Sequence, residues 1–376
     1  MPAAMIAWMH AAGYVDVARL AALKNAEALA AAIDVLGEPP DRIAATLRAH
    51  HIASLVRASL DCAPQPARFA PIYDAIDRLR QLPFLTAAEC VSGFDEVRSH
   101  LGAHGVDVLL LKGLYFAERL YGGSQWRPQF DVDVLIHSST RRQTFRALLA
   151  AGFTRTAYDL HSATFTREHV KVDVHGWLRR APAYRIDEAA IWNSAPTVRV
   201  GGVEARTLSD EFALVMLVLS TFEDLGQGMT RLKQLLDAYL LIRSMDASTD
   251  WSAFFERRSR ENISPIALAV LDLLVRLFQV DDEVPRLAQA LEARRRSIPE
   301  LSRPEILALV FAARKNAGNM AWFRGVYPGS LPSYLLSFWA GGSPANLQPA
   351  SFRHALSAAR VALGTRVPGR DPRARG

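Results

Sequence analysis

The sequence predicts an α+β protein in which a small strand-forming core lies between two helical regions. Apolar residues recur at helical spacing through roughly the first hundred residues and again from Leu208 onward, whereas short strand patterns occupy the stretch between them. We therefore divide the 376 residues into four parts. These are a helical N-terminal region (1–104), an α/β core (105–207), a helical C-terminal region (208–364) and a disordered basic tail (365–376).

Two long helices are expected at the start of the chain. The segment 15–37 has Ala, Leu and Val at helical spacing and ends at Gly37, a residue that suits a helix terminus. A Pro-Pro pair at 39–40 then introduces a helix over 41–60. Two more helices follow over 71–82 and 94–105, so this region is predicted to be entirely helical.

The core is predicted from alternating and apolar runs. VDVLLL (106–111) is typical of a buried strand, and FDVDVLIH (130–137) alternates strictly between polar and apolar residues. A helix over 114–123 is expected between these two strands, and a further helix over 138–152 after them. The remaining strands are predicted at 154–159, 163–168 and 169–176, with a hairpin that turns at Gly201-Gly202.

Helices are predicted again over 208–222 and 231–245, then up to about residue 318, and finally over 350–364. The region 319–350 has no clear pattern.

Composition and charge narrow the class of protein. Half of the residues are hydrophobic and 22% are charged, which is typical of a globular protein with a substantial core. The net charge of +6 suits a polyanionic ligand such as a nucleotide, but no basic–aromatic stripe supports nucleic-acid binding. Two isolated cysteines make a zinc site or a disulfide framework improbable. No secretory leader and no membrane-spanning run is recognised, so we expect a cytoplasmic protein.

Acidic residues share a face on two of the predicted strands. Side chains alternate across a strand, so Asp131 and Asp133 point one way, while Val132, Val134 and Ile136 point the other way, into the core. In HVKVDVHG, Lys171, Asp173 and His175 likewise share the polar face. If the two strands are neighbours, three carboxylates form a cluster that suits Mg²⁺ or Mn²⁺. We expect Lys171 and His175 to support these ligands, and His175 to bind them by hydrogen bonds rather than the metal directly.

A strand–Lys–Gly–helix junction is the second candidate feature. A helix start offers free N–H groups and a positive dipole end to phosphate, and Gly113 allows the backbone to approach a ligand closely. Lys112 adds a charge, and Arg127 is a candidate for bidentate phosphate binding. The spacing differs from that of a Walker P-loop.

These motifs, in this order, resemble a known family. LLLKG, a helix, Arg127, FDVDVLI, a helix ending in AAGF, and VKVDVHG are similar to the uncharacterised bacterial nucleotidyltransferases of the DNA polymerase β superfamily, relatives often found near lasso-peptide and surface-polysaccharide genes. The resemblance covers roughly residues 100–245 and includes the helical segments at 208–217 and 232–242. It implies a nucleotidyltransferase fold with a mixed sheet. It further implies that Asp131 and Asp133 are the first metal-binding pair and that Asp173 is the third carboxylate. Lys112 and Gly113 then occupy the position of the superfamily's Gly-Ser loop.

Three functional hypotheses follow. The first is an enzyme that transfers a nucleoside monophosphate from a nucleoside triphosphate to a hydroxyl of an unknown acceptor, such as a small molecule, a sugar, a peptide, a protein or an RNA end. The second is a non-catalytic nucleotide-binding or scaffold protein with the same fold. The third is a metal-dependent phosphohydrolase that uses the three aspartates and His175.

Simpler structural interpretations exist for single residues. Asp131 and Asp133 could be a solvated strand face, Lys112 a surface lysine, and Arg127 a structural partner of Asp131 or Glu118. Lys233 and Asp237 lie four residues apart on a helix, so an ion pair between them is the default interpretation.

Overall fold

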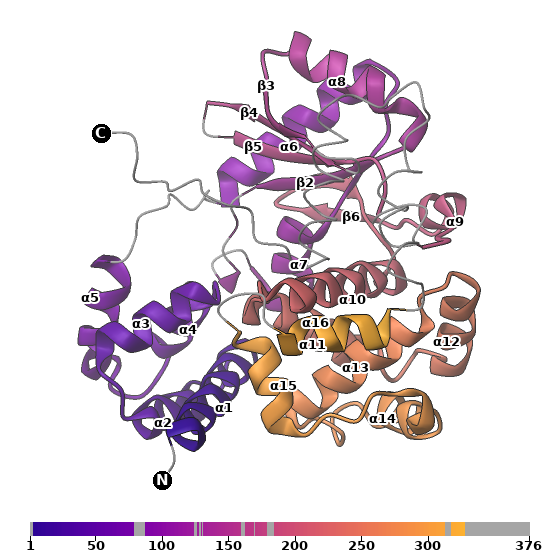
Figure 1. Cartoon of the computed structure of the whole chain (residues 1–376). Coiled ribbons are helices and arrows are strands. Elements are labelled where there is room, and N and C mark those ends of the chain that lie inside the picture. Colours follow the sequence, from indigo (N-terminus) through magenta and orange to yellow (C-terminus); the bar gives the residue numbers. More distant parts are fainter. Residues whose placement is uncertain are drawn as a thin grey trace, which may run out of the picture.

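A mixed β-sheet forms the centre of the protein (Figure 1). The structure is a computed structural model that describes residues 3–78, 87–123, 126–127, 129, 131–158, 162–168, 170–178, 184–312 and 317–327. Within these residues the main sheet has five strands in the order β1-β2-β5-β4-β3. They are β1 (Val108–Leu110), β2 (Val132–Ile136), β3 (Thr154–Tyr158), β4 (Ser162–Arg167) and β5 (Val170–His175). The strand-bearing core between helical regions is therefore as predicted.

The sheet is mixed because only one of its neighbouring pairs is parallel. β2 and β5 run parallel, whereas β1 with β2, β5 with β4, and β4 with β3 are antiparallel. A second hairpin, β6 (Thr197–Val200) and β7 (Val203–Arg206), turns at Gly201-Gly202 as expected. Thr207 joins it to the main sheet, since its hydroxyl donates a hydrogen bond of 2.8 Å to the carbonyl of Leu110.

The two faces of the sheet have different environments. Val132 and Val134 of β2 and Val172 and Val174 of β5 are buried, and Val170 is partly buried. Helix α6 (Ala87–Ala103) packs on these strands, and α8 (Arg141–Ala150) packs beside α6. Gly93 of α6 lies so close to the sheet that an added Cβ would come 2.8 Å from Val170. On α8, the Phe145 ring packs edge-on against Phe165 with centroids 5.2 Å apart. The polar side chains that alternate with the valines therefore leave the sheet on the other face.

The N-terminal region contains more helices than the sequence pattern predicts. The expected helix over 15–37 is divided into α1 (Ala3–Ala22) and α2 (Ala26–Leu36), because Lys24 has a left-handed φ of 56° and Asn25 caps the new helix. The expected helix over 41–60 is divided into α3 (Pro40–Ala49) and α4 (Ala53–Leu60) at His51, whose φ is 58°. Both predictions of one continuous helix were wrong, since apolar periodicity continues through the breaks. Gly37 does end α2, in the left-handed conformation.

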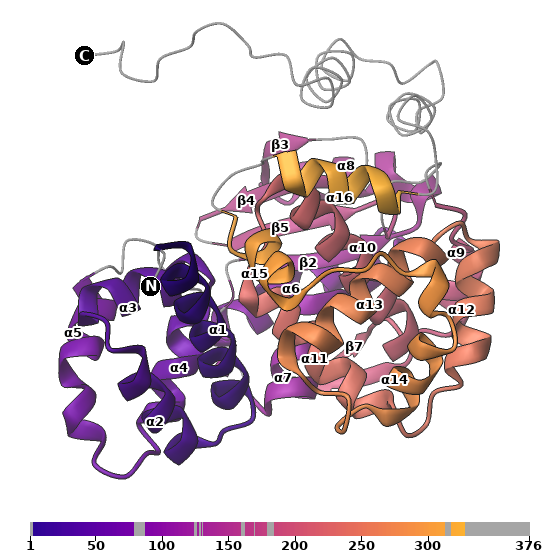
Figure 2. The same ribbon diagram turned by 60° about the horizontal axis from the view of Figure 1, so that its bottom comes forward.

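The remaining helices surround this core. α1 packs against α11, α13 and α15, so the first helix contacts the C-terminal helices (Figures 1 and 2). The bounds are α5 (Ala70–Arg78), α7 (Lys112–Tyr121), α9 (Glu188–Asn193), α10 (Asp210–Gln227), α11 (Leu232–Met245), α12 (Trp251–Arg260), α13 (Ser264–Phe278), α14 (Pro285–Glu292), α15 (Arg303–Val310) and α16 (Ala317–Val326). The buried apolar residues of all these elements join in one continuous hydrophobic core.

Some predictions lie outside the described residues. These are the end of the helix over 71–82, the helix over 350–364 and the basic tail. The boundaries that we assigned to the four regions stay predictions. In the described part of the chain, none of the helices combines the length and the apolar character that a membrane crossing requires.

The contact between α10 and α16 yields the first prediction. A Cβ added to Gly226 of α10 would come 2.5 Å from Phe323 of α16, whereas a Cβ on Gly325 of α16 would meet nothing within 4 Å. Alanine favours a helix at both positions, but only Gly226→Ala overpacks the interface. We expect Gly226→Ala to lower the free energy of unfolding by about 1–3 kcal/mol relative to Gly325→Ala, as measured by urea denaturation. Equal stability of the two variants would contradict this packing.

Candidate active site

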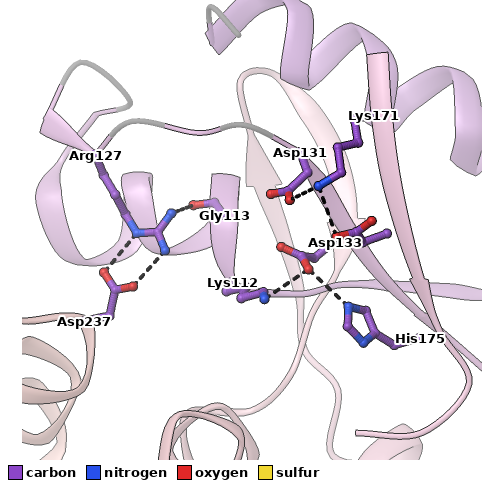
Figure 3. Close-up of polar contacts among 9 residues, drawn as sticks. Lys112, Gly113, Arg127, Asp131, Asp133, Lys171, His175 and Asp237 are labelled. Carbon is purple, nitrogen blue, oxygen red and sulfur yellow. Dashed lines mark hydrogen bonds and ion pairs between the residues drawn. The ribbon is translucent and has the colours of Figure 1, made fainter. Parts of the chain in front are cut away.

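Three carboxylates meet on the sheet face that α6 and α8 leave free. Asp133 of β2 is the register partner of Asp173 in the parallel strand β5, so both side chains leave the sheet on the same side. Asp131 precedes Asp133 by two residues and shares that side (Figure 3). The parallel pairing of β2 with β5 therefore brings together the three acidic residues that we singled out from the sequence.

Cationic side chains lie directly between these carboxylates. The ammonium of Lys171 is 3.0 Å from Oδ2 of Asp131 and 3.5 Å from Oδ2 of Asp173, so one cation contacts both (Figure 3). On Asp133, Oδ1 lies 3.1 Å from Nζ of Lys112 and 3.1 Å from Nε2 of His175. Lys171 and His175 thus contact the acidic residues that we expected them to support.

The carboxylates influence one another electrostatically. The pKa of Asp131 is raised, chiefly by burial and next by repulsion from Asp133, although Lys171 opposes the rise. Burial also pushes the pKa of Asp133 upward, but Lys112 and His175 outweigh it and hold that pKa well below its ordinary value. Burial would lower the pKa of Lys171, yet Asp131 and Asp173 overcome it and raise it. The site therefore combines a compact group of negative charges with compensating cations.

The helix start beside this cluster has an unusual backbone. Gly113, the second residue of α7, has φ 36° and ψ −113°, a combination that strongly favours glycine. A Cβ there would also come 3.2 Å from Oε1 of Gln129. The N-cap residue, Leu111, makes no side-chain hydrogen bond to this end of α7 in the described structure. The N–H of Leu111 donates to the carbonyl of Asp133 and fixes the turn beside the carboxylates.

Arg127 lies in a buried ion pair next to the turn at Gly113. Its guanidinium binds both carboxylate oxygens of Asp237 in α11, at 2.9 and 2.7 Å, and donates to the carbonyl of Gly113 at 3.2 Å (Figure 3). The side chain is only 5% exposed. In this structure its nitrogens hold the turn at Gly113, and phosphate binding by Arg127 stays a prediction.

Asp237 is the site-shaping residue that the sequence analysis missed. It also accepts a hydrogen bond of 2.9 Å from the hydroxyl of Tyr121. This buried carboxylate therefore contacts the end of α7 directly and its start through Arg127. The sequence contains a weak signal for this role, because Asp237 is an acidic residue within a leucine-rich helix. We interpreted it as the ion-pair partner of Lys233. The arginine partner lies 110 residues away and could not be recognised from local spacing.

Lys233 lies one turn before Asp237 on α11. Burial, followed by the positive charges of Arg127 and Lys112, lowers its pKa to about 8, against the opposing effect of Asp237 and Asp131. The helical C-terminal region therefore contributes a further basic residue to the surroundings of the carboxylates.

The donor set suits a hard divalent cation. The candidate ligands are carboxylate oxygens, one ammonium already contacts two of them, and the buried Oδ1 of Asp173 has no hydrogen-bond partner in the described structure. As the side chains stand, no group of three or more His, Cys, Asp or Glu residues in the described ranges is arranged to hold a metal ion. Lys171 would have to withdraw from Asp131 and Asp173 for them to share one, so the ligand set stays a prediction.

A mixed sheet with acidic residues on neighbouring parallel strands, next to an uncapped helix start, defines a protein of the nucleotidyltransferase type. A family model described as "Uncharacterised nucleotidyltransferase" matches residues 37–279. This match spans more than half of the sequence, so the chain belongs to that family of uncharacterised nucleotidyltransferases. The resemblance to uncharacterised nucleotidyltransferases is confirmed. The bacterial origin and the association with lasso-peptide or polysaccharide genes stay predictions.

Comparisons with individual proteins are more distant. One similar solved structure is the antibiotic-resistance factor ANT(2'')-Ia, with 17% identity, a TM-score of 0.37, and coverage of 46% of this chain and 94% of the other. Another is an antigenic nucleotidyltransferase-like protein from Paracoccidioides brasiliensis, with 16% identity, a TM-score of 0.34, and coverage of 56% and 95%. The comparison with curated proteins finds no match. None of these similarities indicates a substrate for this chain.

The buried ion pair of Arg127 and Asp237 generates a stability prediction. Removing one partner leaves an uncompensated buried charge, so Asp237→Ala should lower the free energy of unfolding by about 3–5 kcal/mol. The double change Arg127→Met/Asp237→Leu should recover most of that loss. Asp41→Ala, which breaks an exposed pair with Arg78, serves as the control with a cost of at most about 1 kcal/mol. Urea denaturation of the four proteins measures these differences, and a loss in Asp237→Ala no larger than the control would contradict the role of the pair.

Lys233 generates a prediction about pH. Its pKa is about 8 in the folded protein, compared with about 10.4 in an unfolded chain, so the unfolded state binds more protons between these values. Stability from this residue therefore rises as pH increases from about 8 to about 10.4. The difference in unfolding free energy between wild type and Lys233→Met should rise over that window and stay constant below about pH 7. If the unfolding free energies of wild type and Lys233→Met differed by the same amount at every pH, the pKa of Lys233 would not be depressed.

Proposed function

We propose that this chain is a metal-dependent enzyme that transfers a nucleoside monophosphate from a nucleoside triphosphate to a hydroxyl group and releases pyrophosphate. Membership of a nucleotidyltransferase family gives the class of the protein. The metal dependence, the triphosphate substrate and the hydroxyl acceptor are the proposal.

One observation carries this proposal: the register of β2 with β5. It sets Asp133 beside Asp173, with Asp131 two residues away on the same side. Three neighbouring carboxylates repel one another, so keeping all of them ionised costs free energy unless a cation compensates their charge. In this structure Lys171 and Lys112 supply that compensation. A divalent ion bound there would neutralise developing charge and orient the reacting oxygens.

The other residues have roles that follow from their positions. The uncapped start of α7 at Lys112 and Gly113 would bind the phosphate tail through N–H groups and one ammonium. Asp173 would accept the proton of the acceptor hydroxyl, whose oxygen forms a bond to the α-phosphorus while the bond to pyrophosphate breaks. Arg127 and Asp237 would hold the turn in place without touching the substrate. Catalysis would then rest mainly on positioning and charge compensation.

A non-catalytic nucleotide-binding protein is the second candidate function. The specific observation in its favour is that Lys112, Lys171 and His175 already bind the carboxylates. If these contacts persist with nucleotide bound, the fold binds the triphosphate without turning it over.

Carboxamide variants separate the two functions. We expect Asp131→Asn, Asp133→Asn and Asp173→Asn each to reduce transfer of label from α-³²P-labelled nucleoside triphosphates by about 100-fold or more, with Mg²⁺ or Mn²⁺ and cell extract as the acceptor source. Asp107→Asn, which changes an exposed carboxylate near β1, is the matched control. Thermal unfolding monitors the fold of each variant. Undiminished transfer by Asp131→Asn/Asp133→Asn would refute this site, and nucleotide binding by calorimetry without turnover would favour the second function.

A further inference from the structure

Lys171 differs from the other described cations of the site because its ammonium contacts two of the three carboxylates. Its Nζ lies 3.0 Å from Oδ2 of Asp131 and 3.5 Å from Oδ2 of Asp173 (Figure 3). Within the described residues, these two carboxylates are the acidic groups that compensate its charge. One monovalent cation therefore lies in the space that two carboxylates share.

This ammonium satisfies the two carboxylates only in part. The contact with Asp173 is the longer of the two, and the other oxygen of that carboxylate, Oδ1, is buried without a hydrogen-bond partner in the described structure. A buried polar atom without a partner costs free energy, because it has lost its hydrogen bonds to water. Carboxylate oxygens are also the ligands that Mg²⁺ prefers. Asp131 and Asp173 thus have capacity for a cation of higher charge than one ammonium.

Lys171 and a divalent cation exclude each other from these oxygens. A cation held by Asp131 and Asp173 would meet the ammonium at contact distance, where two positive charges repel strongly. Lys171 is able to withdraw, because its side chain is 40% exposed and a lysine has a flexible four-carbon stem. Metal binding at this pair of carboxylates therefore requires the ammonium to move.

The neighbouring cations are less suited to this exchange. Arg127 is only 5% exposed and binds both carboxylate oxygens of Asp237. Lys112 forms its ion pair with a single carboxylate in the described structure, that of Asp133. Withdrawal of Lys171 instead frees two carboxylates at once and leaves the buried ion pair intact.

The start of α7 lies next to Lys171, across the carboxylates. Lys112, the first residue of α7, contacts Asp133, which is the register partner of Asp173. The oxygens of a phosphate accept hydrogen bonds, and an ammonium donates charge-assisted hydrogen bonds to them. A triphosphate bound at the start of α7 would therefore give the ammonium of Lys171 a new anionic partner after it leaves the carboxylates.

We propose that Lys171 is an internal counter-ion that occupies the divalent-cation position of the resting site, and that its ammonium moves to a phosphate oxygen when the nucleoside triphosphate binds. The carboxylates then bind a divalent cation tightly only together with the triphosphate. This inference rests on the proposed nucleotidyl transfer, to which it adds a substrate-binding residue and an order of binding.

Two binding measurements on the full chain test the proposal without using the transfer reaction. Electron paramagnetic resonance of free Mn²⁺ measures metal binding in the absence of nucleotide. Calorimetry with inorganic tripolyphosphate in excess Mg²⁺ measures phosphate binding, whichever base the protein prefers. Circular dichroism monitors the fold of each variant.

Lys171→Met removes the ammonium and keeps an unbranched side chain. We expect it to bind Mn²⁺ about 10-fold more tightly than wild type, because no ammonium has to be displaced, and to bind tripolyphosphate about 10-fold more weakly, because a charge-assisted hydrogen bond is lost. Lys171→Gln replaces it if the Met variant proves unfolded.

Two further variants serve as controls. Lys171→Arg keeps the positive charge and should exclude Mn²⁺ as wild type does. Lys24→Met removes the same charge elsewhere, from an ammonium that lies 4.6 Å from the ring centroid of Trp126, and should change neither affinity.

The outcomes separate this inference from the proposed function. If Lys171→Met binds Mn²⁺ no more tightly than wild type, or binds tripolyphosphate equally well, the inference is overturned, because Lys171 then only stabilises the carboxylates. Either result leaves metal-dependent nucleotidyl transfer intact. If neither wild type nor Lys171→Met binds Mn²⁺, the carboxylates form no metal site, and the proposed function is refuted together with the inference.

Discussion

The parallel pairing of β2 with β5 in one register is the constraint on which the candidate site depends. Side chains alternate along a strand, so a slip of one residue would turn Asp173 toward the helices and expose valines in its place. Burial of Val172 and Val174 against the layer of α6 and α8 prevents that slip. The hydrophobic effect acts on the valines and thereby positions the carboxylates between them. The acidic cluster thus results from packing on the opposite face of the sheet.

A second constraint joins the helical region to the sheet. Asp237 of α11 binds Arg127, which in turn donates a hydrogen bond to the carbonyl of Gly113. The carboxylate of Asp237 also accepts a hydrogen bond from the hydroxyl of Tyr121. Buried charges are tolerated only when they are fully paired, so these groups must stay together in the folded protein. The C-terminal helices consequently do more than cover the sheet, because they determine the conformation of the turn at which α7 begins.

Charge balance links the two constraints. Asp131, Asp133 and Asp173 bring negative charge to one place, and Lys112, Lys171 and His175 neutralise it in the structure described here. The burial that raises the pKa of Asp131 also makes every interaction at the site stronger than it would be in water. In the proposed reaction the same cations would meet a phosphate, so nucleotide binding and release of the carboxylates would be coupled.

Local pattern by itself determined the element types, the strand faces and the identity of the acidic residues, because the two-residue period of a strand and the 3.6-residue period of a helix are properties of neighbouring residues. The helix breaks at Lys24 and His51 could not be predicted from this pattern, because a left-handed φ angle at a residue other than glycine does not change the apolar periodicity. Only the tertiary structure decided that Asp133 stands beside Asp173, and that Arg127 pairs with Asp237. Asp133 and Asp173 lie 40 positions apart in the chain, and Arg127 and Asp237 lie 110 positions apart. Neighbours that distant are identified only when packing selects one arrangement of the chain from many.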